Sequence, residues 1–142
     1  MTNTKLFFSD LDLVRDLAFE GVRGYRKQEE VCGLLGQGKS QIELIPIENE
    51  EKENKQFHFS FNFVSCIRLL RGKKLTPLAI YHTHLFKSPN LSGSDVRVMT
   101  QTGLDMVVVS LASNEVRHYT KMQQSFPCIE STTLNLLEAV PL

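Results

Sequence analysis

Two histidines one residue apart, His82 and His84, end the apolar run Leu78–Tyr81 and begin a polar loop that leads to Asp95. Side chains two positions apart on a strand point to the same face, so both imidazoles would project together from one strand end. Two neutral imidazoles and a carboxylate suit zinc, and a fourth position open to water is typical of catalytic sites. The loop is long enough to double back, so we predict that His82, His84 and Asp95 form a three-ligand set.

Each of these residues also has a simpler interpretation. An H-x-H pair alone is a weak signal, because histidines on surfaces or in hydrogen bonds are common. Ser92 and Asp95 have the spacing of a capping box at the start of a helix. A carboxylate bound to zinc would not be free to cap, so we expect these two interpretations of Asp95 to compete.

A third carboxylate, Glu30, lies far upstream, directly before the apolar stretch Val31–Gly36. Zinc hydrolases need a base that is not a ligand, because it must accept the proton of the attacking water. Glu30 is a candidate for that base. The alternative is a solvated glutamate at a helix–strand junction, which is how we interpret its neighbour Glu29.

Taken together, these residues resemble the JAMM motif of the MPN (Jab-domain) zinc metallopeptidases, in a compact prokaryotic form. The matching segments are Glu30-Val31-Cys32-Gly33, His82-Thr83-His84 and, seven residues later, Ser92-Gly93-Ser94-Asp95. The resemblance implies that His82, His84 and Asp95 bind one catalytic Zn²⁺ ion. It also implies that Glu30 deprotonates the attacking water and that Ser92 hydrogen-bonds the developing oxyanion. Thr83 would face the other side of the strand and support the ligands from behind.

The resemblance also implies an activity. Family members with the full motif hydrolyse peptide or isopeptide bonds after the C-terminal glycine of ubiquitin or a ubiquitin-like protein. The substrate expected here is a ubiquitin-like or sulfur-carrier protein, as precursor or conjugate. Similar bacterial enzymes are encoded beside activating and conjugating enzymes, including those of antiviral defence. Leu85 and Phe86 follow the ligands in a loop that we expect to be exposed, and they are candidates for substrate binding; alternatively, they cover the core beneath.

Two other functions remain open on the sequence. One is a non-catalytic MPN-type scaffold, although such relatives usually lack ligands and none is missing here. The other is a nucleic-acid-associated protein resembling the RadC family, which shares the H-x-H-x7-S-x-x-D spacing. That family has a loop richer in Pro and Gly after the second histidine, where this chain has Leu85-Phe86-Lys87.

The composition of the chain limits the classes of binding partner that we expect. The formal net charge of zero over 142 residues gives no basic excess for nucleic acid or an anionic membrane. The sequence has neither a signal peptide nor an apolar run of the roughly 18 residues that a membrane span needs, so we expect a cytoplasmic protein. Its length fits one domain over residues 1–142. The three cysteines lack disulfide or zinc-ribbon spacing, and we interpret them as small buried hydrophobes.

The periodicity of apolar residues predicts an α/β (α+β) fold in which a single mixed β-sheet is flanked by helices. The predicted helices are 10–26, 63–72 and 94–103, and the predicted strands are 31–38, 41–49, 57–61, 78–84, 106–112 and 115–121. The strand at 106–112 is expected to be central and buried on both faces. His58 and His118 are expected on the surface, and residues 131–142 to form a short helix or an apolar tail for a partner.

Overall fold

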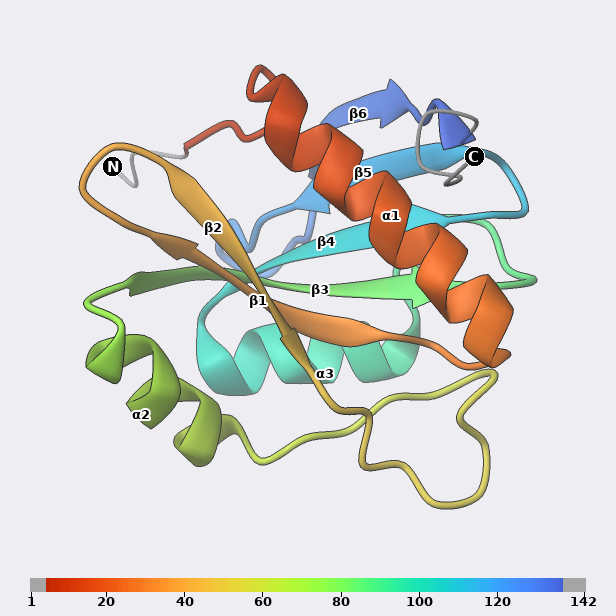
Figure 1. Ribbon diagram of the computed structural model, residues 1–142, viewed down its shortest axis with the longest axis horizontal. Helices are drawn as coiled ribbons and strands as arrows, with labels where there is room; N and C mark the ends of the chain where they lie inside the picture. The colour runs from red at the N-terminus through yellow and green to blue at the C-terminus, as the bar shows by residue number, and fades with distance from the viewer. Residues whose placement is uncertain (1–4, 137–142) are drawn as a thin grey trace.

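A mixed sheet of six strands, in the order β2-β1-β3-β4-β5-β6, forms the centre of the computed structural model, which describes residues 5–136 (Figure 1). Only the pair β3–β4 is parallel; the other neighbours are antiparallel. The elements in chain order are α1 (Leu11–Lys27), β1 (Cys32–Gln37), β2 (Ile42–Ile47), α2 (Phe63–Gly72), β3 (Thr76–His84), α3 (Gly93–Thr102), β4 (Asp105–Ser110), β5 (Glu115–Tyr119) and β6 (Cys128–Thr133). Among these described residues, no helix is long and apolar enough to span a membrane.

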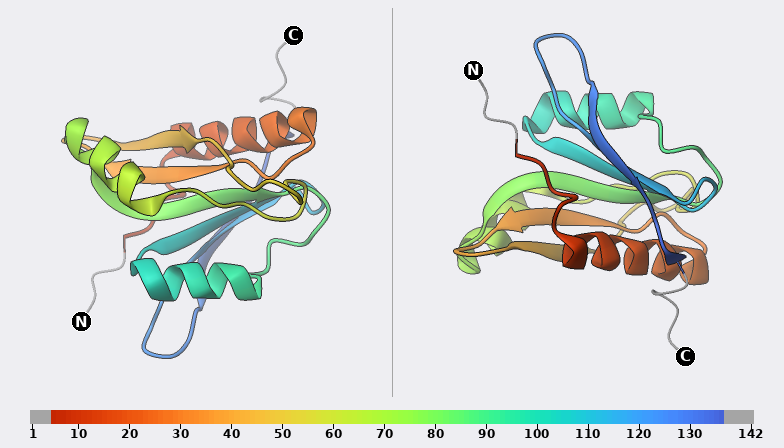
Figure 2. Two further views of the ribbon diagram at one scale, coloured as in Figure 1. Left: turned by 90° about the horizontal axis from the view of Figure 1, so that it is seen from below. Right: turned by 90° about the horizontal axis from the view of Figure 1, so that it is seen from above.

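Helix α1 covers one face of the sheet, and α3 covers the other (Figure 2). Asp10 caps α1 by accepting the Leu13 N–H, and the apolar side of α1 packs Leu13 and Leu17 into the core. Apolar side chains from α2 and α3 form a second core on the opposite face. Two covered faces explain why β4 is buried throughout its central residues, as the sequence predicted.

Side chains along β3 alternate between these two cores. Ala79 and Tyr81 point into the core beneath α1, and Ile80 points into the core beneath α2 and α3. Because strand side chains alternate, His82 and His84 share the face of Ile80. The two histidines therefore leave β3 on the side on which α3 begins.

The predicted mixed sheet flanked by helices is confirmed, but the predicted strand at 57–61 is wrong. These residues belong to the loop between β2 and α2. Phe59 and Phe61 instead stack on each other, with ring centroids 6.0 Å apart, and pack against the core below α3. Of the two alternatives predicted for 131–142, the helix is wrong for residues 131–133, which lie in β6; residues 137–142 lie outside the described part of the chain.

The prediction for His118 is also wrong, because this residue is fully buried in β5. Its two ring nitrogens contact carboxylate oxygens of Asp105, at 2.8 Å, and Glu130, at 2.6 Å, and its ring stacks on Phe7. This cluster joins β4, β5, β6 and the segment before α1. His58, by contrast, is exposed as predicted. The cysteine prediction holds for Cys32 and Cys66, which are buried, but is wrong for Cys128, which is exposed.

Candidate metal centre

The candidate ligands lie where β3 ends and α3 begins. His82 and His84 lie within the last three residues of β3, and Asp95 lies in the first turn of α3. Because α3 is the crossover between the parallel strands β3 and β4, its N-terminus lies near the carboxyl ends of both strands, where open α/β sheets bind ligands. All three side chains are about 1% exposed.

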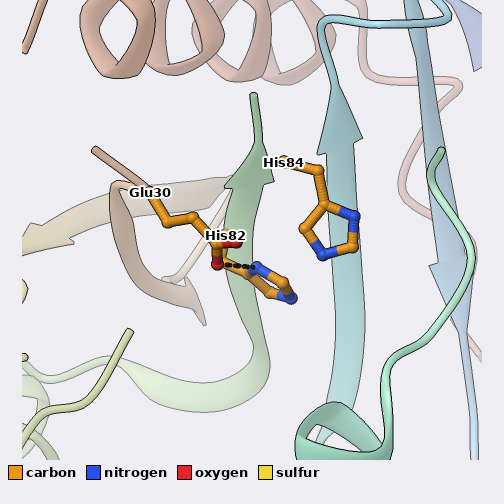
Figure 3. Close-up of side chains that lie close together, drawn as sticks. All are labelled: Glu30, His82 and His84. Atoms are coloured by element: carbon orange, nitrogen blue, oxygen red, sulfur yellow. Dashed lines mark hydrogen bonds and ion pairs between the residues drawn. The ribbon is translucent and has the colours of Figure 1, made fainter. Parts of the chain in front are cut away.

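Both imidazoles are oriented through their Nδ1 atoms. His84 Nδ1 lies 2.7 Å from the Ser88 carbonyl oxygen, and His82 Nδ1 lies 3.2 Å from Glu30 Oε1, the contact drawn in Figure 3. A carbonyl and a carboxylate only accept, so each Nδ1 donates and a neutral ring then presents a lone pair at Nε2. Neither Nε2 atom has a hydrogen-bond partner among residues 5–136, although both are buried. A metal ion would satisfy both of these lone pairs.

Asp95 serves α3 and faces the histidines at the same time. Its Oδ2 accepts the Ser92 N–H at 2.9 Å, and Ser92 Oγ accepts the Asp95 N–H at 3.1 Å, which completes a capping box. Its Oδ1 lies 2.8 Å from His82 Nε2, an ion-pair contact when that imidazole is protonated, and Oδ2 lies 3.9 Å from His84 Nε2. The cap uses only Oδ2, so Oδ1 is left facing the histidines; whether capping and metal binding compete at Asp95 stays a prediction.

Glu30 is the fourth member of the cluster. It lies two residues before β1, is 1% exposed, and has one oxygen on His82 Nδ1, while its Oε2 has no hydrogen-bond partner in the described chain. Ligand atoms of Glu30, His82 and His84 lie within 4.8 Å of one another, so these three could hold a metal ion. The sequence motif thus converges in space, with all of its carboxylates and imidazoles within one buried cluster.

The charges in this cluster are strongly coupled. Burial opposes protonation of His82, but the carboxylates of Asp95 and Glu30 outweigh it and raise the pKa of His82 to about 9. Burial and the neighbouring His82 lower the pKa of His84. Burial would raise the pKa of Asp95, but His82 outweighs it and the pKa lies below its usual value. A metal ion bound at Nε2 of His82 would therefore displace a proton.

The family description "prokaryotic homologs of the JAB domain" matches residues 22–124, which include every residue of the cluster. The chain belongs to the prokaryotic JAB-domain family. Two solved structures resemble this JAB domain in fold, each with a TM-score of 0.60. One, from Desulfitobacterium hafniense, is 18% identical and covers 87% of this chain and 88% of its own. The other, from Salinibacter ruber, is 17% identical and covers 84% and 86%. No curated protein matches the chain in sequence.

Steric crowding explains why the last residue of the E-x-x-G segment in this JAB domain, Gly33, is a glycine. A Cβ on Gly33 would lie 2.6 Å from the ring and hydroxyl of Tyr81 and would also collide with the Ile45 carbonyl oxygen. Tyr81 lies on β3 opposite Gly33, and its hydroxyl donates to Glu20 Oε1 of α1 at 2.5 Å. The absence of a side chain at Gly33 therefore leaves room for the Tyr81 ring of β3 next to β1.

Thr83, between the two histidines, supports the cluster from the α1 side as predicted. Its Oγ1 accepts the Val31 N–H at 3.0 Å, next to Glu30. Cys32 pairs with His82 across the sheet, but burial raises the pKa of its thiol to about 12. The thiol donates to the Ile47 carbonyl oxygen, at 3.6 Å.

Of the two predicted substrate-binding residues, only Phe86 is on the surface. It is 55% exposed and lies beside Phe57, with ring centroids 5.9 Å apart. Leu85 is 5% exposed, so the expectation of an exposed side chain is wrong for Leu85, which lies in the interior. A hollow of about 130 Å³ next to the cluster is lined in part by Phe57 and Lys87.

Three residues at this centre were missed by the sequence analysis. Lys87 Nζ lies 3.5 Å from Glu30 Oε2 and donates to the Phe57 carbonyl oxygen. Phe59 stacks on the ring of His82, and the buried side chain of Asn49 binds the Glu30 carbonyl. No local signal marks them, because Lys87 and Asn49 are polar residues in polar stretches and Phe59 belongs to a pattern that predicts a strand.

Proposed function

We propose that this JAB domain is a zinc-dependent peptidase or isopeptidase that hydrolyses the bond after the C-terminal glycine of a ubiquitin-like protein. One observation carries the proposal: two buried imidazoles present unpartnered Nε2 atoms to a carboxylate, and a second carboxylate with a free oxygen lies beside them. Buried polar atoms without partners are costly, and a catalytic metal centre accounts for all of them.

We assign His82, His84 and Asp95 as the zinc ligands, and we place Glu30 outside that set. His82 uses Nδ1 for Glu30, so the Glu30 contact lies on a different ring atom from the Nε2 that would bind metal. Asp95 Oδ1, in contrast, is 2.8 Å from that Nε2. Three protein ligands leave a coordination position open, as catalytic zinc sites require.

Zinc at such a site supplies Lewis acidity, lowering the pKa of a water molecule to about 7 and polarising a carbonyl group. The Glu30 Oε2 atom accepts the proton of the attacking water and passes it to the leaving amine. Ser92 Oγ uses a lone pair on the Asp95 N–H, so its own O–H remains available for the oxyanion of the scissile carbonyl. Lys87 Nζ lies 3.5 Å from Glu30 Oε2, so an ammonium group stands beside the carboxylate on the side of the hollow.

The surroundings of the cluster support a glycine-ended substrate. A hollow of about 130 Å³ has room for an extended main chain but little room for large side chains next to the scissile bond. The exposed pair Phe57 and Phe86 beside it is suited to an apolar patch on the folded part of a ubiquitin-like protein. We include in the proposal a cytoplasmic setting, with activating and conjugating enzymes encoded nearby, as in antiviral defence.

The test begins with the zinc content of the purified protein. A panel of ubiquitin-like proteins ending in glycine, each with a C-terminal extension, is then incubated with the protein and analysed by mass spectrometry. We expect one zinc per chain and cleavage directly after the glycine. Glu30→Gln should keep the zinc and lose cleavage by at least about a hundredfold.

Glu29→Gln is the matched control, because it removes the neighbouring carboxylate, which lies 3.5 Å from Lys27 Nζ and not in the cluster. The Glu29 side chain is 14% exposed, so the expectation of a solvated glutamate is wrong. The control variant should cleave at the rate of the unmodified protein. Zinc-free protein would instead support the non-catalytic scaffold, and full cleavage by Glu30→Gln would refute the assignment of the base.

A further inference from the structure

We propose that Asn49 is a positioning residue that ties the catalytic base to the loop covering the metal ligands. The inference rests on the proposed function, because it takes His82 as a zinc ligand and Glu30 as the base. The loop is residues 49–60, between β2 and α2, drawn in yellow in Figure 1. Below, it is called the cover loop.

The side chain of Asn49 makes four hydrogen bonds. Its Nδ2 donates to the Glu30 carbonyl oxygen at 2.7 Å and to the His58 carbonyl oxygen at 3.0 Å. Its Oδ1 accepts the Glu51 N–H at 2.9 Å and the Ser60 N–H at 3.2 Å. Asn49 is 2% exposed, so these bonds are shielded from water. They close both ends of the cover loop onto each other and onto the backbone of the base.

Asparagine is specifically suited to this position. A primary amide has two N–H donors and an oxygen with two lone pairs, and here both halves are fully used. The partners also fix the orientation of the amide, since two carbonyls face one end and two N–H groups face the other. Aspartate has the same shape, but it would place an oxygen against two carbonyl oxygens and lose both donated bonds.

The bonds to Asn49 have a direct consequence for the metal centre. His58 and Ser60, two of its partners, flank Phe59, whose ring stacks on the ring of His82 with centroids 4.4 Å apart and an interplanar angle of 30°. One amide therefore connects the peptide of Glu30 to the aromatic ring that lies on a ligand. A second bond, from the Glu30 N–H to the Lys55 carbonyl oxygen, fastens the backbone of the same residue to the cover loop.

Fixed neighbours of metal ligands raise affinity, because they hold the donor atom in place and limit access of water. The Phe59 ring restricts rotation of His82 and so keeps Nε2 directed toward Asp95. When the side chain at position 49 can no longer donate, the His58 carbonyl loses its bond, and Phe59 loses one of its two flanking anchors. The metal then leaves faster, and the backbone of Glu30 loses the bond to its carbonyl oxygen.

The test compares Asn49→Asp with Asn54→Asp in the full chain loaded with zinc. Asn54 lies in the same loop, but it is exposed, so the control carries the same change of charge without the buried bonds. Zinc release into an excess of chelator is followed with a colorimetric indicator. The absorption bands of the Co²⁺-substituted proteins report ligand geometry. Hydrogen exchange reports the Glu51 and Ser60 amides.

For Asn49→Asp we expect zinc release that is about tenfold faster or more and altered Co²⁺ bands, because the two bonds donated to Glu30 and His58 are lost. The Glu51 and Ser60 amides should stay protected, because the aspartate oxygen still accepts both of them, and their protection shows that the loop remains folded. Asn54→Asp should match the unmodified protein in all three. A folded Asn49→Asp protein with unchanged zinc release and unchanged Co²⁺ bands would overturn the proposal.

A second variant keeps the test decisive if Asn49→Asp does not fold. Phe59→Leu removes the stack on His82 from a half-buried position and should release zinc faster; release at the unmodified rate would refute the proposal. Failure of the proposed function gives a different result. A chain that binds zinc tightly but cleaves no substrate would contradict the peptidase assignment, while faster zinc release in the variants would still support the role of Asn49.

Discussion

Substituting Gly33 with alanine is the sharpest test of how β1 is placed beside the metal centre. The added Cβ would lie 2.6 Å from the Tyr81 ring, so Tyr81 or β2 must move by several tenths of an ångström. Moving Tyr81 breaks its 2.5 Å bond to Glu20, a bond to a charged group, which costs about 1.5–3 kcal/mol. Overpacking costs about 1–3 kcal/mol, and the lower backbone entropy of alanine offsets about 0.4–1 kcal/mol. The net loss in the free energy of unfolding is about 3 kcal/mol.

Urea unfolding followed by circular dichroism measures this loss, and thermal unfolding should show a midpoint roughly 10 °C lower. Gly72→Ala is the control, because a Cβ at this helix end meets nothing within 4 Å. It should leave stability within about 0.5 kcal/mol of the unmodified protein or raise it slightly. If Gly33→Ala unfolds within about 0.5 kcal/mol of the unmodified protein, the steric account of this glycine is wrong.

Three further predictions concern the substrate surface, the cap of α3 and the buried histidine. Phe86→Ala should raise KM for a folded ubiquitin-like substrate more than for a short peptide, and equal effects would exclude Phe86 from the contact with the folded domain. Ser92→Ala should lower the free energy of unfolding by about 1 kcal/mol and cleavage by about a hundredfold with zinc content unchanged; Ser94→Ala, at an exposed neighbour, should change neither. His118→Gln should cost about 2 kcal/mol in urea unfolding, because Glu130 loses a buried partner; unchanged stability would count against this cluster.

The parts of the fold that local patterns determine could be predicted from the sequence. Helix α2 has the predicted bounds Phe63–Gly72, and β3 ends at His84 as expected. In both, the apolar period and the residues at the ends depend on neighbours within one or two turns of chain. The proximity of His82, His84 and Asp95 could be predicted for another reason: their spacing is a property of one short segment.

The errors concern residues whose partners are distant in sequence. Alternation in 57–61 indicates that one side is buried, but it does not say whether a neighbouring strand is available. No described strand of the sheet pairs with these residues, and Phe59 and Phe61 pack against the core from a loop. His118 is covered by Phe7 and contacts Glu130. These two residues are 123 positions apart in the sequence, so no local pattern indicates that His118 is buried. Asn49 was missed because its partners, apart from Glu51, are brought to it only by folding.

The distribution of the motif along the chain separates two events in folding. His82, His84 and Asp95 lie within a single strand–loop–helix unit, so bringing them together closes only a short loop. Glu30 is 52 residues from His82 and reaches it only when β1 has paired with β3. Contacts of low sequence separation form sooner than distant ones. His82, His84 and Asp95 can therefore come together on the nascent β3–α3 unit, whereas Glu30 joins them only when the sheet closes. On the proposed function, the centre would remain without its base until the chain is folded.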